Sequence, residues 1–409
     1  MASAAERDGG RLPAPPRTRP SAAPSIAPPF APFILPSTAQ KTALTSNDSR
    51  HSINDTWLSC IQESPGDVSL YFDDGRGNFI THGSQLRRPI ASTVKLLHLV
   101  AFAEEVAEGR IGIRDPFSLA SWDLNHLPGT DGGARARSFD AFGIRHEGER
   151  AADPQGSVPA VQLAKAMIGF SDNSAADCLH DLLGPSRIVR IGARYGWPEA
   201  DLRSVLGELL LLVTDAPLEG VGPAERRRLG DELRQRYATD ESFRVRAAHR
   251  VPVAAAPTAY ERQAHWAAGG PAATARQIAD LMTTVARGAV RAEEPKQLAQ
   301  RFLEMQTPRL GVPGLVGSGA KDGIFPGILS TAVNTRWSDG RTGVAVAVVS
   351  RLSQAGYATA ARSGPLSGPL RRALVDERWA RGLAAAVTEV KDTESPVAGR
   401  SDEVGDVYR

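Results

Sequence analysis

The chain has 409 residues, of which 42% are hydrophobic, and its formal net charge at pH 7 is +2. This length allows one large domain or two ordinary ones, and the apolar fraction is that of a globular protein. Acidic and basic residues nearly balance and form no block of like charge, which excludes the usual electrostatic signature of a nucleic-acid-binding protein. We therefore expect a small-molecule or peptide substrate and no nucleic-acid partner.

The chain has two cysteines, Cys60 and Cys178, and eight histidines that lack the short repeated spacings of a zinc or iron site. We expect no metal, no cofactor and no disulfide framework. No run of 18 apolar residues exists, so we expect no membrane-spanning helix. The N-terminus lacks a basic segment followed by an unbroken apolar stretch. A cytoplasmic location is the resulting expectation, although a misassigned start codon would hide an export signal.

The first elements follow a tail. Residues 1–45 are rich in Pro, Ala and Ser and bury too little apolar surface to offset the entropy of backbone ordering, so we interpret them as disordered. Segments 67–72 and 78–82 flank the turn-rich residues 73–77, which predicts a hairpin. Residues 92–109 have an apolar side and no Gly or Pro before Gly109, which predicts a helix.

The later elements are mostly helical and then extended. Helical character is found at 158–168, 174–183, 185–194, 223–238 and 273–287. From Leu315 the pattern is extended, and segments 328–337 and 342–349 form a second predicted hairpin. A last helix at about 369–390 and a polar tail at 391–409 complete the chain.

This order predicts an α/β (α+β) fold within residues 52–390. Both ends of that region build one antiparallel sheet, which helices flank, and a helical subdomain is inserted at about 110–310.

Ser92 and Lys95 are three residues apart in the first turn of a predicted helix, so their side chains share a face. A serine hydroxyl needs a base to become a nucleophile. A lysine is such a base when burial or a neighbouring cation lowers its pKa. A Ser-x-x-Lys match alone is weak, and a chance surface pair is the alternative.

Two further motifs also have a structural and a functional interpretation. Ser171-Asp172-Asn173 precedes a predicted helix, where such residues commonly cap free backbone amides. Lys321-Asp322-Gly323 lies in a Gly-rich extended run, where it can be a turn with an exposed charge.

Taken together and in this order, the three motifs resemble the Ser-x-x-Lys, Ser-Asp-Asn and Lys-Thr-Gly triplet of class A β-lactamases and penicillin-binding proteins. The resemblance covers about residues 52–390. A looser similarity, through residues 127–133 and 325–329, is to β-lactamase-like proteins of antibiotic-biosynthesis clusters. The resemblance implies a β-lactamase/transpeptidase-like fold and a serine hydrolase.

The resemblance also implies a role for each polar residue. Ser92 attacks an acyl carbon and Lys95 accepts its proton. Ser171 relays a proton to the leaving group with Lys321 beside it. Asn173 hydrogen-bonds a polar arm of the substrate.

The third motif supplies the remaining substrate contacts and departs from the family pattern. The backbone amides of Ser92 and Ile324 would form the oxyanion hole, and Gly323 keeps the strand edge open for the substrate. Asp322 stands where the family has Thr or Ser, whose hydroxyl helps to hold the carboxylate of a penicillin. An ionised aspartate would repel that anion, unless Asp322 is turned away and paired to an arginine. A substrate with a neutral or cationic group at that position is the better match.

The deacylating base of class A β-lactamases has no clear counterpart. Glu208 lies at a similar distance after the second motif, but residues 207–212 indicate a buried amphipathic helix. Without such a base we expect long-lived acyl-enzymes with β-lactams and turnover of activated esters. The loop at 127–137 lines the pocket mouth or is an ordinary surface turn. We take His98 as structural.

The expected function is an acyl-serine hydrolase that forms an acyl-enzyme on Ser92 with a small-molecule ester, amide or β-lactam, in specialised metabolism or resistance. The alternative is an accessory protein that keeps the pocket for binding with little or no catalysis. A D,D-peptidase is disfavoured, because no export signal or anchor is recognised.

Overall fold

The computed structural model describes residues 60–61, 63–288, 298–305, 311–362 and 367–393. All of them belong to one compact unit, Pro32–Arg409. The tail predicted at 1–45 lies outside the described residues, and so does most of the tail predicted at 391–409. Among the helices that the structure describes, none has the length and apolarity needed to cross a membrane.

A five-stranded antiparallel sheet forms the centre of this unit, in the order β2-β1-β11-β10-β9. Its strands are β1 (Val68–Asp73), β2 (Phe79–His82), β9 (Leu315–Phe325), β10 (Ile328–Trp337) and β11 (Thr342–Ser350). Both predicted hairpins are present. The pairing of β1 with β11, with Val68 opposite Val349, joins the two ends of the domain. The predicted fold class is therefore confirmed.

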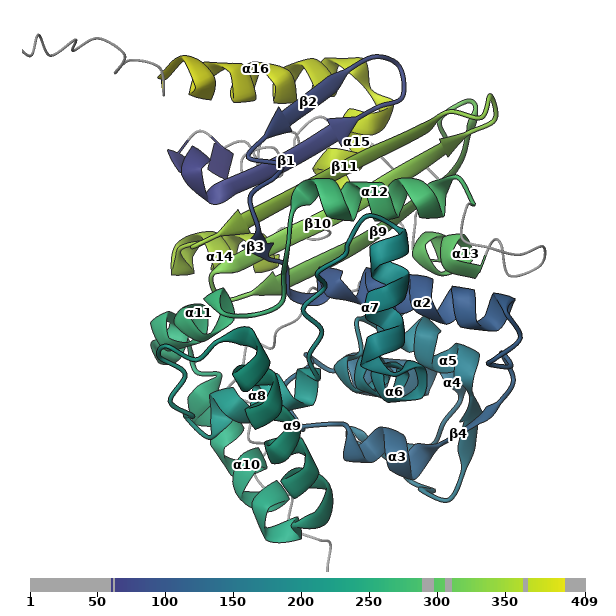
Figure 1. The fold of residues 1–409 in the computed structure, drawn as a ribbon, viewed down its shortest axis with the longest axis vertical. Coiled ribbons are helices and arrows are strands. Elements are labelled where there is room, and N and C mark those ends of the chain that lie inside the picture. Colours follow the sequence, from purple (N-terminus) through teal and green to yellow (C-terminus); the bar gives the residue numbers. More distant parts are fainter. Residues whose placement is uncertain (1–59, 62, 289–297, 306–310, 363–366, 394–409) are drawn as a thin grey trace, which may run out of the picture. The chain divides into compact units, whose positions relative to one another are not determined.

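Helices cover both faces of the sheet, as Figure 1 shows. They include α2 (Lys95–Ala107), α12 (Ala275–Ala286), α14 (Gln354–Arg362), α15 (Ser367–Val375) and α16 (Glu377–Thr393). Because side chains alternate along a strand, Leu70 and Phe72 of β1 pack with the C-terminal helices α14–α16. Tyr71, between them, packs on the opposite face with α2 and α12. The sheet is thus buried on both sides.

The helix predicted at 369–390 is two helices, α15 and α16, separated at Asp376. The Asp376 carboxylate accepts a hydrogen bond of 2.9 Å from the Arg378 amide and so caps the start of α16. This bend lets Leu374 of α15 and Leu383 of α16 join the same apolar cluster. The chain forms two helices rather than the one predicted because the bend lets apolar residues of both be buried.

The inserted segment is mainly helical. Its helices are α3 (Leu119–Leu124), α4 (Ala134–Phe142), α5 (Ala160–Lys165), α6 (Asn173–Leu183), α7 (Pro185–Arg194), α8 (Val205–Val213), α9 (Pro223–Thr239), α10 (Glu241–Ala254), α11 (Tyr260–Ala268) and α13 (Leu298–Glu304). The five segments predicted there correspond to α5, α6, α7, α9 and α12. Helices α3, α4, α10, α11 and α13 were not predicted from the sequence. Although α12 falls within the predicted helical subdomain, it packs on the sheet.

Short elements complete the unit. The minor strand pairs are β3 (Arg88–Pro89) with β8 (Ala272–Ala273), β4 (Pro116–Ser118) with β7 (Ser157–Pro159), and β5 (His146–Glu147) with β6 (Arg150–Ala151). The short helical turns are η1 (Pro65–Asp67), η2 (Ala91–Val94), η3 (Ala166–Phe170) and η4 (Pro257–Ala259). Two of them, η2 and η3, immediately precede residues of the candidate site.

Helices α8 and α9 cross at two glycines, which gives the first prediction. A Cβ atom on Gly207 would lie 2.9 Å from the carbonyl carbon and oxygen of Gly230. Gly207→Ala should therefore lower the free energy of unfolding by about 1–3 kcal/mol, measured by urea denaturation. Gly382→Ala in α16 is the matched control, because no atom lies within 4 Å of the added methyl group. Equal stability of the two variants would contradict close helix packing here.

Candidate active site

Ser92 lies in the 3-10 turn η2, directly before helix α2. The turn is tied to the sheet through Ser330 of β10. The hydroxyl of Ser330 donates to the carbonyl of Ile90 at 2.7 Å and lies 2.6 Å from the Thr93 hydroxyl. Ala91 has a positive φ of 45°, which is costly for a residue with a Cβ and is found mainly where the surroundings impose it. Ser92 is therefore held half-buried at a strained junction between sheet and helix.

Lys95 is 1% exposed and points at the second motif. Its Nζ donates to the carbonyl oxygen of Ser171 at 2.6 Å, to Oδ1 of Asn173 at 2.7 Å and to the Ser171 hydroxyl at 3.2 Å. Burial, and next the positive charge of Lys321, lower the pKa of Lys95 to about 7. An appreciable fraction of this amine is consequently neutral near pH 7.

Lys321 of β9 approaches Ser171 from the sheet side. Its Nζ donates to the Ser171 hydroxyl at 3.0 Å and to the carbonyl of Asp322 at 2.7 Å. Burial lowers the pKa of Lys321 to about 8. Ser171 follows the π-helical turn η3 and has a positive φ of 62°. Its hydroxyl thus lies between two amines, in a backbone conformation that the fold imposes.

The second motif serves as a helix cap and as part of the candidate site. Oδ1 of Asp172 accepts hydrogen bonds from the amide of Ala175 at 2.9 Å and from the Ser174 hydroxyl at 2.6 Å, which caps α6. Ser171 and Asn173, on either side of Asp172, both contact Lys95. The motif therefore caps a helix, and its functional interpretation stays a prediction.

The strand β9 separates the residues of the third motif between the two faces of the sheet. Lys321 faces Ser171, whereas Asp322 accepts a hydrogen bond from the hydroxyl of Thr331 on β10. Burial raises the pKa of Asp322, although the Thr331 bond and the positive charges of Lys321 and of Arg371 on α15 oppose the rise. The Asp322 side chain is thus turned away from Ser171 and toward an arginine.

Gly323 packs against the turn η2 that contains Ser92. A Cβ atom at this position would lie 2.7 Å from the carbonyl oxygen of Ile90 and 2.9 Å from the amide nitrogen of Ser92. Both are backbone atoms and cannot move aside without shifting η2. Only glycine lets β9 and η2 approach this closely.

The register of the β9–β10 hairpin fixes the direction of the Ile324 amide. Phe325 pairs with Ile328 across a two-residue loop, and Ile324 pairs with Leu329. The closing pair of such a hairpin is hydrogen-bonded, so the next pair is not, and the Ile324 N–H points away from β10. Asp322 lies two residues before Ile324, so its backbone groups also point away from β10. Its carbonyl oxygen accordingly accepts a hydrogen bond from the Lys321 amine rather than from β10. The Ile324 N–H lies at the free edge of the sheet.

Glu208 and His98, two titratable residues noted in the sequence, have structural roles. The carboxylate of Glu208 is buried and ion-paired to Arg226, at 2.9 Å from Nε, and to Arg203, at 3.1 Å from Nη1. Both carboxylate oxygens of Glu208 therefore accept hydrogen bonds from guanidinium groups. Nε2 of His98 lies 3.4 Å from Nδ1 of His180, and burial with the nearby His180 lowers the pKa of His98 to about 3.

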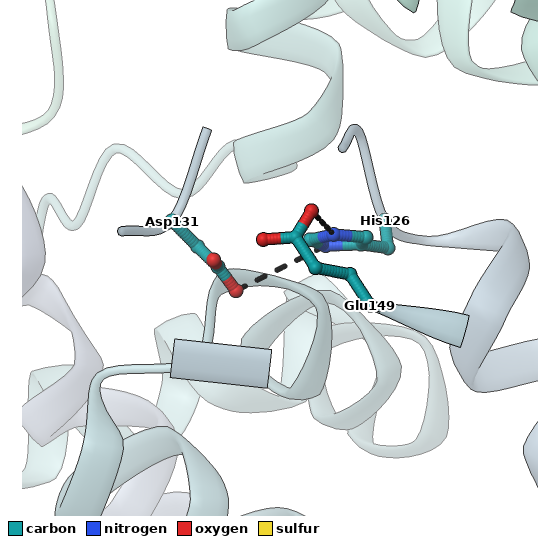
Figure 2. Close-up of side chains that lie close together, drawn as sticks. All are labelled: His126, Asp131 and Glu149. Atoms are coloured by element: carbon teal, nitrogen blue, oxygen red, sulfur yellow. Dashed lines mark hydrogen bonds and ion pairs between the residues drawn. The ribbon is translucent and has the colours of Figure 1, made fainter. Parts of the chain in front are cut away.

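His126, Asp131 and Glu149 form a cluster, shown in Figure 2, that was not predicted from the sequence. Glu149 lies 3.0 Å from Nε2 of the imidazole, and Asp131 lies 4.0 Å from Nδ1. A nitrogen and two carboxylates are a donor set that divalent cations accept. Here the two carboxylates face different nitrogens of the imidazole. The contacts therefore suit a clamp, a set of polar contacts that holds the loop at 127–133 in place, better than a site that shares one ion.

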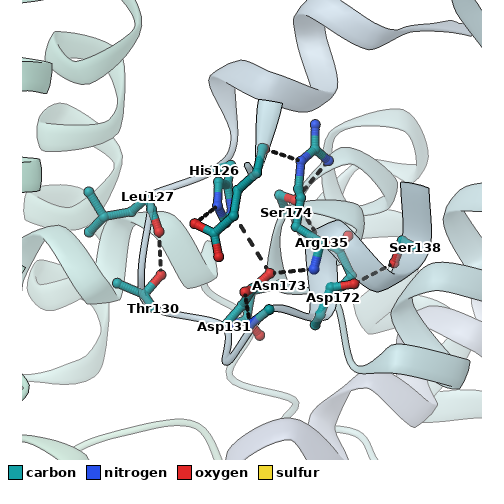
Figure 3. Close-up of polar contacts among 12 residues, drawn as sticks. His126, Leu127, Thr130, Asp131, Arg135, Ser138, Asp172, Asn173 and Ser174 are labelled. Atoms are coloured by element: carbon teal, nitrogen blue, oxygen red, sulfur yellow. Dashed lines mark hydrogen bonds and ion pairs between the residues drawn. The ribbon is translucent and has the colours of Figure 1, made fainter. Parts of the chain in front are cut away.

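This clamp connects the loop at 127–133 to the second motif, as Figure 3 shows. Asp131 accepts hydrogen bonds from the amides of Gly133 and Arg135, both at 2.9 Å. The guanidinium of Arg135 donates to the Ser174 hydroxyl at 3.2 Å. The negative charges of Asp172 and of Asp131 partly oppose the lowering of the pKa of Lys95. No spacing in the sequence indicates the contacts of Glu149 with His126 and of Arg135 with Ser174, because they join segments that are adjacent only in the folded chain.

The model of the Beta-lactamase enzyme family matches residues 52–326. This chain belongs to that family. No curated protein sequence matches it.

Solved structures of β-lactamase-type proteins are similar to this chain at low identity. The structure of PBP-A is 16% identical, with a TM-score of 0.46, and the match covers 83% of this chain and 97% of PBP-A. A β-lactamase from Xanthomonas campestris is 17% identical, with a TM-score of 0.47 and coverages of 79% and 97%. A β-lactamase from Sphaerobacter thermophilus is 17% identical, with a TM-score of 0.46 and coverages of 76% and 95%.

The ion pairs of Glu208 give the second prediction. Glu208→Gln leaves the buried Arg226 without its anion and removes one of the two ion pairs of Arg203, which keeps Asp201, so it should lower the free energy of unfolding by about 3–5 kcal/mol in urea denaturation. Glu225→Gln removes an exposed ion pair with Arg228 and should change stability little. If Glu208→Gln were as stable as the wild type, the structural role of Glu208 would be wrong.

Proposed function

We propose that this β-lactamase-family chain is an acyl-serine hydrolase, in which Ser92 forms an acyl-enzyme with a small-molecule ester, amide or β-lactam. The observation that carries the proposal is the buried Lys95, whose pKa of about 7 suits a general base at neutral pH. It lies one helical turn from Ser92 and contacts Ser171, which Lys321 contacts from the other side.

Acylation follows from this arrangement. Neutral Lys95 takes the proton of the Ser92 hydroxyl while the Ser92 oxygen bonds to the acyl carbon. The bond from that carbon to the leaving group breaks, and the leaving group receives a proton from the Ser171 hydroxyl. Ser171 regains a proton from the Lys95 ammonium, which restores the neutral amine.

The negative charge on the acyl oxygen needs donors in the transition state. The amide of Ser92 and the outward amide of Ile324 are the two donors that we propose. Removing one such donor typically costs about 3 kcal/mol of transition-state stabilisation. Asn173, whose amide oxygen accepts from Lys95, has its amide NH₂ group to donate to a polar arm of the substrate.

Deacylation has less support in the structure than acylation. Three carboxylates act on the pKa of Lys95, namely Asp172, Asp131 and Asp177. Each accepts hydrogen bonds from backbone amides, so none of these three is a good candidate for the base that activates a hydrolytic water. We therefore expect slow release of β-lactam acyl groups and faster release of the acyl groups of small, activated esters.

The orientation of Asp322 bears on the substrate. Its carboxylate contacts Thr331 and lies on the side of Arg371, so its repulsion of a substrate carboxylate is reduced. The expectation that penicillins are poor substrates loses this support. β-Lactams therefore stay within the proposed substrate range beside neutral esters and amides.

The second candidate is a protein that binds a ligand in this pocket with little catalysis. The ion-paired state of Glu208 favours it, because a water-holding base is then missing at the position where the sequence suggested one.

Covalent labelling is the direct test, and it is the third prediction. Intact-protein mass spectrometry after exposure to a fluorophosphonate ester probe and, separately, to a cephalosporin should show one adduct, mapped by peptide analysis to Ser92. Ser92→Ala should take up neither reagent. If neither reagent labels the wild type, the binding protein is the better description.

The fourth prediction concerns pH. Because the neutral form of Lys95 is the base, the labelling rate should rise with pH through about 7 and level off above it. Lys321→Met removes a positive charge that lowers the pKa of Lys95, so the inflection should move to higher pH. Lys165→Met, in α5, serves as the control and should leave the inflection in place. An inflection that stays at the same pH in Lys321→Met would contradict the coupling of the two lysines.

A further inference from the structure

Phe325 shares the site-facing side of β9 with two residues of the third motif. Side chains at alternate positions of a strand lie on one face. Lys321 contacts Ser171, and Gly323 packs against the turn η2, so the next residue on this face is Phe325. It directly follows Ile324, whose amide we propose as an oxyanion donor.

Trp266 of α11 lies against Phe325, with ring centroids 5.0 Å apart and ring planes at 52°. Helix α11 packs on the turn after β9, where a Cβ on Gly327 would lie 3.0 Å from the Ala264 side chain. It also contacts β3, the strand that leads into η2 and Ser92. The aromatic pair therefore connects the end of β9 with the segment before the nucleophile, and both rings are half-buried.

Trp266 is fixed before any ligand binds. The guanidinium of Arg226 lies 5.2 Å from the centre of its ring and donates to its backbone carbonyl at 3.0 Å. Arg226 is itself held by Glu208. A ring held in this way loses little entropy when a ligand packs on it.

We propose that Trp266 and Phe325 form an aromatic subsite that binds a flat, apolar acyl group of the substrate. The inference rests on the proposed function, which orients the substrate along β9. Ser171 and Lys321 handle the leaving group at one end, and the acyl oxygen lies at the Ile324 amide. The acyl substituent then extends toward Phe325, where the paired rings favour an aryl group over an alkyl group.

The test compares esters that share one leaving group. The value of kcat/KM for 4-nitrophenyl phenylacetate should exceed that for 4-nitrophenyl acetate. Trp266→Leu and Phe325→Leu should each lower this ratio about 5- to 10-fold, mainly through KM for the phenylacetate. Trp266→Phe, which keeps a ring, should retain most of the preference. Phe79→Leu, at an exposed aromatic residue of β2, is the control and should leave the ratio unchanged.

The ratio is measured on one protein sample, so a smaller folded fraction in a variant cancels. A ratio that is unchanged in both leucine variants would overturn the subsite, leaving the pair as an anchor for α11. If neither leucine variant folds, the test uses the wild type with 4-nitrophenyl phenylacetate and 4-nitrophenyl cyclohexylacetate, whose ring is not flat. Equal kcat/KM values for these two esters would overturn the proposed subsite. Failure of the proposed function is distinct, because the wild type would then hydrolyse no ester and Ser92 would carry no label.

Discussion

The burial of the Lys95 amine is the constraint on which the rest of the site depends. A buried amine is costly unless its protons have acceptors, and here Ser171 and Asn173 supply them. The same burial, together with the charge of Lys321, lowers the pKa of Lys95 to about 7. Helix α2, the strained Ser171 turn and the start of α6 must therefore meet at one point. Their arrangement keeps the amine buried and hydrogen-bonded and lowers its pKa.

The edge strand β9 organises the opposite side of the site through simple alternation. Lys321, Gly323 and Phe325 share the face toward the turn η2, whereas Asp322 and Ile324 direct their side chains to the C-terminal helices. The outward-facing amide of Ile324 belongs to neither face and lies at the free edge. The strand β9 thus provides the Lys321 amine, a position at Gly323 where the backbone approaches η2, and the outward amide of Ile324. The directions of these three groups depend on the register of the β9–β10 hairpin.

Several parts of the fold and the site followed from local pattern. The hairpins at 67–82 and 328–349 and the helix after Ser92 were predictable because alternation, turn residues and helix periodicity are local signals. The family followed from three motifs in order. Helices α10 and α11, like α3, α4 and α13, were not predicted, since α10 contains Pro252 and one of the three buried positions of α11 is the polar Gln263. The prediction of a single helix at 369–390 was wrong, because the helix ends before Asp376 and the Asp376 side chain caps a second helix.

The sequence by itself determined the chemical identities: a serine and a lysine one helical turn apart, a second serine with an asparagine, and a lysine before a glycine. It could do so because each motif is a short local pattern. Only the tertiary structure decided which polar groups meet. It turned Asp322 toward Thr331 and Arg371, paired Glu208 with two arginines, and joined His126 to Asp131 and Glu149. These contacts join separate elements or depend on strand register. Register and packing are set by the burial of whole apolar faces, which no short pattern contains.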